Sequence, residues 1–192
     1  MGSIDLNYRE EGDNRAYRYY STDLIIQHIE LNSNVLDVGA GDGAVALPVA
    51  EITSSSVVCF DQARDRLDYL ESIKGDLPIS TQQGDCHKLP FSNAQFDCVY
   101  SRMLLAILPE WRTALTEQVR VCKPGGRIIA HHRSANIVDF VERAVPVSER
   151  RDDILRRRRR NNRSLATRQE FLTAVNNLNV SIERTIPIIS LR

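Results

Sequence analysis

The sequence predicts an α/β fold in which an open, mostly parallel sheet is covered by helices on both faces. From residue 34 onward, short apolar stretches alternate with segments of helical periodicity. The first apolar stretch leads directly into a glycine-rich turn, and the second ends in an aspartate. In open sheets of this kind, ligands collect at the carboxyl ends of the strands. A single domain spanning residues 1–192 is expected from the length.

Composition narrows the choice of function. The 25 basic and 25 acidic residues balance to a net charge of zero, which argues against general binding of nucleic acid. Neither a secretory signal nor an apolar run long enough for a bilayer is apparent, so a cytoplasmic protein without membrane contact is expected. The four cysteines form no C-x-x-C pair and therefore predict no metal site and no disulfide framework; they are Cys59, Cys86, Cys98 and Cys122.

The segment before the first strand, residues 1–30, is expected to be helical and holds four of the six tyrosines. Apolar residues at roughly helical spacing follow them, from Leu24 to Ile29. One interpretation is a helix packed on the sheet with tyrosines on its flank. The other is a lid over a bound ligand, with Tyr17 and Tyr20 as the contacts, since aromatic faces attract a cationic centre.

The glycine turn follows a strand that contains Val35, Leu36 and Val38. Glycines at positions 39, 41 and 43 permit positive φ and a close approach of bare backbone to a ligand, and a helix begins near residue 45. The pattern Gly39-x-Gly41-x-x-Ala44 fits a dinucleotide fingerprint. Asp37 and the glycines at every second position also fit another class of nucleotide cofactor, so the turn alone leaves both ligands open.

A second strand, Ser56–Phe60, ends at Asp61. An acid there is placed to accept hydrogen bonds from both hydroxyls of a ribose, although an aspartate also caps helices. A helix over residues 64–72 and a third strand, Ile79–Gln83, follow. Asp61 therefore supports a ligand of the adenosine type without choosing between the two cofactor classes.

The next motifs make that choice. Gly84-Asp85 follows the third strand, and Leu89-Pro90-Phe91 precedes a fourth strand, Gln95–Ser101, which contains Asp97 and Val99. A helix over residues 109–121 then leads through Lys123-Pro124-Gly125-Gly126 to a fifth strand, residues 128–132. Together with Asp37-x-Gly39-x-Gly41-x-Gly43, this ordered set resembles the class I S-adenosylmethionine-dependent methyltransferases over about half of the chain.

The resemblance implies a Rossmann-like sheet with strand order 3-2-1-4-5-7-6, a cofactor-binding core over residues 34–132, and S-adenosylmethionine as the cofactor. A catalytic base is optional in this chemistry, and His131 and His132 are weak candidates for it. The residues implied as cofactor contacts, besides the lid tyrosines, are Asp37, Gly39, Ala40, Gly41, Gly43, Asp61, Gln62, Gly84, Asp85, Cys86 and Ser101.

The remainder, residues 133–192, is expected to form the substrate side. Arg156–Arg160 is either a solvated segment or a clamp for an anionic substrate, with nucleic acid the less favoured partner. A final helix over residues 171–175 and a strand over residues 180–186 are predicted. Only six residues follow, so the seventh strand is expected to be missing or incomplete, with a second copy of the chain as an alternative cover for the sheet edge.

The predicted function is methyl transfer from S-adenosylmethionine to a small-molecule acceptor that the sequence does not identify. The alternative is a protein that binds the cofactor without turnover and acts as a regulatory or partner subunit, which a short sheet would suit.

Overall fold

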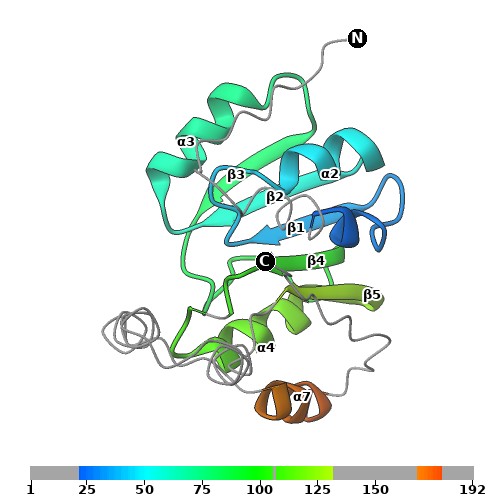
Figure 1. Cartoon of the computed structure of the whole chain (residues 1–192), viewed down its shortest axis with the longest axis vertical. Coiled ribbons are helices and arrows are strands. Elements are labelled where there is room, and N and C mark those ends of the chain that lie inside the picture. The colour runs from blue at the N-terminus through cyan, green and yellow to red at the C-terminus, as the bar shows by residue number, and fades with distance from the viewer. Residues whose placement is uncertain (1–21, 106, 132–167, 179–192) are drawn as a thin grey trace, which may run out of the picture.

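The computed structural model describes residues 22–105, 107–131 and 168–178, and these form a five-stranded parallel sheet with helices on both faces (Figure 1). The strand order is β3-β2-β1-β4-β5. The strands are β1 (Asn34–Val38), β2 (Ser56–Asp61), β3 (Ile79–Gln83), β4 (Phe96–Arg102) and β5 (Cys122–His131). The predicted fold class and the first five places of the predicted strand order are confirmed.

The central strand β1 is buried on both faces because apolar residues occupy nearly every position. Val35, Leu36 and Val38 are fully buried, and β1 pairs in parallel with β2 on one side and β4 on the other. A continuous apolar run of this kind is typical of a strand covered by helices on both faces. The glycine turn at its carboxyl end is therefore attached to the most rigid part of the sheet.

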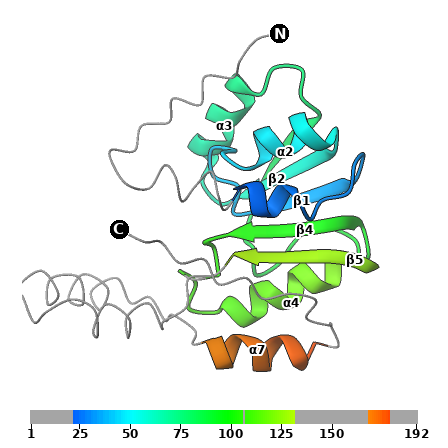
Figure 2. The same cartoon turned by 45° about the vertical axis from the view of Figure 1, so that its right-hand side comes forward.

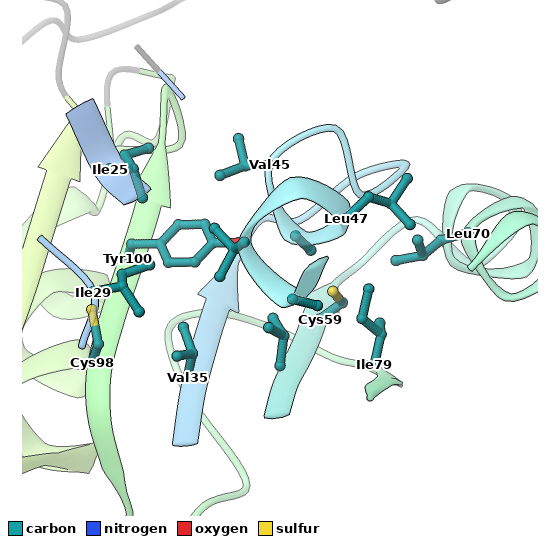
Figure 3. Packing of buried hydrophobic residues seen from close by; sticks show 14 of the residues in the cluster. Ile25, Ile29, Val35, Val45, Leu47, Cys59, Leu70, Ile79, Cys98 and Tyr100 are labelled. Carbon is teal, nitrogen blue, oxygen red and sulfur yellow. The ribbon is translucent and has the colours of Figure 1, made fainter. Parts of the chain in front are cut away.

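Helices on the two faces build separate cores. On one face, the helical residues 22–26, α2 (Ala46–Thr53) and α3 (Arg64–Ile73) cover the sheet, and their apolar side chains form one cluster with Tyr100 (Figure 3). On the other face, α4 (Trp111–Val121) packs with α7 (Arg168–Asn176) outside it (Figure 2). The rings of Trp111 and Phe171 stack with centroids 5.6 Å apart. This alternation of faces follows from right-handed crossovers between parallel strands.

The connection between β3 and β4, residues 84–95, contains no helix. It is held instead by α4: the Arg120 guanidinium donates to the carbonyl oxygens of Leu89 and Phe91 at 2.9 and 2.8 Å. The Glu117 carboxylate accepts from the Leu89 backbone N–H at 2.8 Å and pairs with Arg120. These bonds fix a crossover that would otherwise leave backbone groups unpaired.

One sequence prediction needs correction. The strand expected over residues 128–132 begins six residues earlier, because Cys122 is already extended and pairs with Phe96. The Lys-Pro-Gly-Gly segment is an irregularity within β5, since the next pair of that ladder is Cys98 with Arg127. A Cβ on Gly126 would lie 2.7 Å from the Asp97 carbonyl oxygen, so the glycine is needed for close approach of the two strands.

Several predictions concern residues outside the described ranges. These are the lid tyrosines, His132, the arginine run and the strand over residues 180–186. The predicted final helix is present and longer than expected, as α7. Among the described residues, none of the helices has the length and apolar character that crossing a membrane requires.

Candidate functional site

The glycine turn is bonded directly to the neighbouring strand. The backbone N–H groups of Gly39 and Ala40 donate to the Phe60 carbonyl oxygen at 2.7 and 3.2 Å. Gly39, Gly41 and Gly43 have φ values of +78°, +56° and +79°, which only glycine adopts at low cost. The turn thus presents bare backbone at the carboxyl edge of the sheet, as the sequence predicts.

Asp61 lies against this turn from the end of β2. One carboxylate oxygen accepts from the Gly41 backbone N–H at 2.8 Å, and the other accepts from the Ala63 N–H at 2.9 Å, just before α3 begins. It orders the start of α3 and also reaches the glycine turn, and its predicted contact with a ribose stays a prediction. Each carboxylate oxygen can accept a further hydrogen bond.

Asp37 lies beneath the turn rather than on its surface. It is 2% exposed, and its carboxylate accepts a hydrogen bond from the Tyr100 hydroxyl at 2.8 Å. Burial raises the pKa of this carboxyl from 3.8 to about 7, although the Tyr100 bond and the positive charge of Arg102 lower it. Its predicted contact with the cofactor remains a prediction, and any influence on a ligand above the turn has to be electrostatic.

The segment after β3 adjoins the same edge. Gly84 donates its N–H to the Asp61 carbonyl oxygen at 3.0 Å, and a Cβ there would lie 2.4 Å from the Phe60 ring. Asp85 accepts from both the backbone N–H and the Nδ1 of His87, at 2.9 and 2.6 Å. These bonds hold the pKa of Asp85 below its usual value, so the carboxylate is an exposed anion.

Two further predicted contacts lie beside this segment. The Gln62 carbonyl oxygen accepts from the Gln83 side chain at 3.0 Å, which ties the end of β3 to the residue after Asp61. Cys86 is half-buried, and burial raises the pKa of its thiol to about 11, so it is a neutral packing group. Asp85, Cys86 and His87 each offer one atom of a kind that binds metal ions, and these atoms lie within 4.8 Å of one another. A search of the sequence for C-x-x-C pairs does not detect this grouping.

Ser101 lies in the core, and its predicted contact with the cofactor stays a prediction. It is 1% exposed, and its hydroxyl donates to the Gln118 side-chain oxygen of α4 at 3.2 Å. The residues after it come closer to the turn: Leu104 would lie 3.0 Å from a Cβ on Gly39, and Met103 has a φ of +63°. A non-glycine residue in this region is strained, which is common next to functional sites.

His131 ends β5 at the same edge of the sheet and is half-buried. Its carbonyl oxygen accepts from the Met103 N–H at 2.9 Å, so the strained residue and the candidate base belong to one connection. The predicted role of His131 as a catalytic base stays a prediction. Nothing in the sequence pattern pointed to Met103 or Leu104 beyond their order after the fourth strand.

Sequence reasoning did not single out Tyr100. Asp37 is a polar residue in an apolar strand, but the β1–β4 register that places Tyr100 opposite it is seen only in the structure. One cavity of about 340 Å³ lies between α4 and α7 and is lined in part by Arg112, and another of about 190 Å³ is lined in part by Lys123. Neither cavity is lined by a residue that was predicted to contact the cofactor. The lid tyrosines and the arginine run, which are expected to lie around the cofactor and the substrate, are outside the described residues.

Comparison with protein families gives a match to a methyltransferase domain over residues 36–130. An uncharacterised protein of Mycobacterium tuberculosis is 35% identical over 96 residues, which cover 49% of this chain and 35% of that protein. A demethylmenaquinone methyltransferase of Oceanobacillus iheyensis is 29% identical over 107 residues, 53% of this chain and 45% of that enzyme. The chain thus spans less than half the length of these relatives.

Solved structures show the same fold. The YcgJ protein of Bacillus subtilis has a TM-score of 0.68 at 24% identity, over 85% of this chain and 69% of that one. A chain from the complex of the Haloferax volcanii Trm112 methyltransferase activator with a methyltransferase has a TM-score of 0.73 at 16% identity, covering 93% of this chain and 75% of that one. At these identities the likeness concerns the fold alone.

Proposed function

Residues 36–130 belong to the methyltransferase-domain family, and from this premise we propose that the chain transfers the methyl group of S-adenosylmethionine to a small-molecule acceptor. One observation carries the proposal. The glycine turn, Asp61 and Asp85 follow three neighbouring strands and are joined by backbone hydrogen bonds along one edge of the sheet. Their order along this edge matches the order of methionine, ribose and adenine in S-adenosylmethionine.

Each of these groups has chemistry suited to one part of the cofactor. The bare backbone of residues 39–43 would hold the methionine portion, and the Asp61 carboxylate would accept the ribose hydroxyls. The exposed Asp85 carboxylate, already fixed by His87, would accept the adenine amino group. These are the residues that would hold the cofactor, and their positions are fixed by hydrogen bonds to neighbouring strands rather than by long side chains.

Catalysis by such a site consists mainly of placement. When bound, the cofactor supplies an activated methyl group on a sulfonium, so the chain has to align the acceptor and exclude water. His131, at the end of β5, would take a proton from an acceptor that loses one on methylation. The rigid sheet edge therefore contributes orientation, and the histidine contributes a proton acceptor only where the acceptor needs it.

A small organic acceptor is favoured by the relatives. Among curated proteins that match this chain are methyltransferases named for demethylmenaquinone and for sterols. We propose an acceptor of the same size class, with an anionic group facing the arginine-rich segment, residues 150–163. The second candidate is a protein that binds the cofactor without turnover and acts as a regulatory or partner subunit. One structural neighbour, a chain of a complex between a methyltransferase and its activator, is an example of this fold within an assembly.

Calorimetric titration of the purified chain with S-adenosylmethionine, S-adenosylhomocysteine and NAD tests the binding half of this proposal. We expect the two sulfur compounds to bind and NAD not to bind. Binding of the dinucleotide alone would refute it. Transfer of a labelled methyl group to fractionated metabolites then separates the enzyme from the regulatory subunit, since only the enzyme incorporates label.

A further inference from the structure

Asp37 and Tyr100 form a buried polar pair that no part of the proposed binding scheme requires. They occupy opposite positions in the parallel β1–β4 ladder. The Tyr100 hydroxyl donates to Asp37 Oδ2 at 2.8 Å, and Tyr100 and Asp37 are 0% and 2% exposed. Among the described residues Tyr100 is the donor to this carboxyl. A buried carboxyl is costly to the fold, so its presence calls for an explanation.

The pair is enclosed by apolar side chains on the helix side. Tyr100 extends from β4 toward the start of α2, among residues such as Ile25 and Val45 (Figure 3). Apolar side chains of the helices on this face belong to the same cluster as Tyr100. Within the part of the chain that the structure describes, the ionisable groups with electrostatic influence on Asp37 or Tyr100 come from the strands and the turn; they are Arg102, Asp61, Asp42, Cys59 and Cys98.

Charged groups of both signs lie around the turn. Asp37, Asp42 and Asp61 contribute three carboxyls, Arg102 is a cation that lowers the pKa of Asp37, and the Arg66 Nη1 would lie 3.5 Å from a Cβ on Gly41. In surroundings of low polarity the interaction of a carboxylate with a ligand charge is stronger than in water. Ionised Asp37 therefore favours a cationic ligand over a neutral one of the same shape.

We propose that Tyr100 is a positioning residue that holds the Asp37 carboxylate beneath the glycine turn, so that the site prefers the cationic methyl donor to its neutral demethylated product. This inference rests on the proposed function. S-adenosylmethionine carries a sulfonium charge and S-adenosylhomocysteine does not, although the two are otherwise nearly the same in shape. The pair would thus lower the affinity for the product relative to the donor and limit inhibition by accumulated product.

Ionisation of Asp37 near neutral pH makes the preference for the donor depend on pH. Its pKa of about 7 means that the carboxyl is largely protonated below neutral pH and largely anionic above it. The preference for the sulfonium is therefore present above about pH 7 and is lost as the pH falls. Removal of the Tyr100 hydroxyl takes away a hydrogen bond to the anion, so it should move this transition to higher pH.

The experiment measures the dissociation constants of both compounds by calorimetry at about pH 6 and about pH 8. For the parent chain, we expect the ratio of the two affinities to change roughly tenfold in favour of the sulfonium at the higher pH. Tyr100→Phe should reduce that change, and Asp37→Asn should abolish it. The Asp37→Asn variant also provides the baseline for ionisation of the ligands themselves.

Tyr69→Phe is the matched control, because Tyr69 is 52% exposed on α3 and should leave both ratios at parental values. Circular dichroism checks that each variant is folded. If Tyr100→Phe retains the parental ratio and pH midpoint, or if the parent and Asp37→Asn respond to pH alike, the inference is wrong. If the parent binds neither compound, the proposed function fails as well, which is a different result.

Discussion

Asp37 is the residue at which stability and function compete most directly. A carboxyl with a pKa raised from 3.8 to about 7 binds its proton more tightly in the folded chain than in the unfolded one. Its favourable contribution is fully present below about pH 4 and is lost as the pH rises through 7. At higher pH the anion is retained in the core at a cost of up to about 4 kcal/mol.

Replacing Asp37 by asparagine should therefore stabilise the protein more at about pH 8 than at about pH 5. We expect a gain of about 1–3 kcal/mol at the higher pH, because the amide carries no charge and still accepts from Tyr100. Urea unfolding of both proteins at the two pH values measures this difference. Parallel dependence of the two unfolding free energies on pH would contradict the role assigned to burial.

Asp61 provides the second test at the level of a single residue. Asp61→Ala should weaken binding of S-adenosylmethionine by about 1–3 kcal/mol, since charge-assisted bonds to the ribose would be lost. Asp85→Ala should weaken binding less, because Asp85 is exposed. Asp76→Ala, at an exposed position in the loop before β3, is the control. Unchanged affinity in a folded Asp61→Ala variant would show that the ribose role is wrong.

At the scale of the element, the glycines of the turn are needed both for their backbone conformation and for close packing. Two glycine positions allow the free-energy costs of these two requirements to be measured separately. Gly43 has a φ of +79°, and a Cβ there would lie 2.4 Å from the Leu70 side chain. Gly75 has a φ of +56°, and a Cβ there would meet no other atom within 4 Å. The two positions share the conformational cost of an added methyl group and differ in the steric one.

Gly75→Ala should destabilise the protein by about 1 kcal/mol, from conformation alone. Gly43→Ala should cost about 1–3 kcal/mol more, because α3 has to shift away from the turn. Thermal unfolding of both variants measures the difference. In a Leu70→Ala background, Gly43→Ala should cost less than it does in the parent, because the clashing side chain is gone. Equal losses for the two glycine variants would rule out a packing role for Gly43.

The strands, the turn and the acid after β2 were predictable because each leaves a local signal: an apolar run, glycines at fixed spacing, or a polar residue at a strand end. The start of β5 was not, because the extended conformation of Cys122 depends on pairing with Phe96, which is distant in sequence. The burial of Ser101 against Gln118 likewise depends on how α4 packs. Tertiary contacts decided these cases over local propensity.

At the scale of the whole molecule, α7 is attached to the core through α4. Trp111 is the one tryptophan of the sequence, is 1% exposed, and stacks on Phe171. Its indole fluorescence therefore reports on the packing of α7 against the rest of the domain. This allows the attachment of the C-terminal region to be followed without a label.

Phe171→Ala should shift the Trp111 emission to longer wavelength, because the indole becomes exposed to water. It should lower the free energy of unfolding by at most about 4 kcal/mol, because Phe171 is only partly buried. Amide hydrogen exchange within residues 168–178 should rise in parallel. Thr173→Ala, at an exposed position of the same helix, should change neither measurement. An unaltered emission spectrum for Phe171→Ala would indicate that α7 is held by other contacts.

The bonds from Arg120 and Glu117 to Leu89 and Phe91 join the β3–β4 connection to α4. The segment that carries Asp85 has no helix of its own and leads into this connection, while α4 also packs on α7. An acceptor that ordered α4 would lower the entropic cost of ordering the segment with Asp85. By thermodynamic reciprocity, a cofactor bound to that segment would raise the affinity for the acceptor by the same factor.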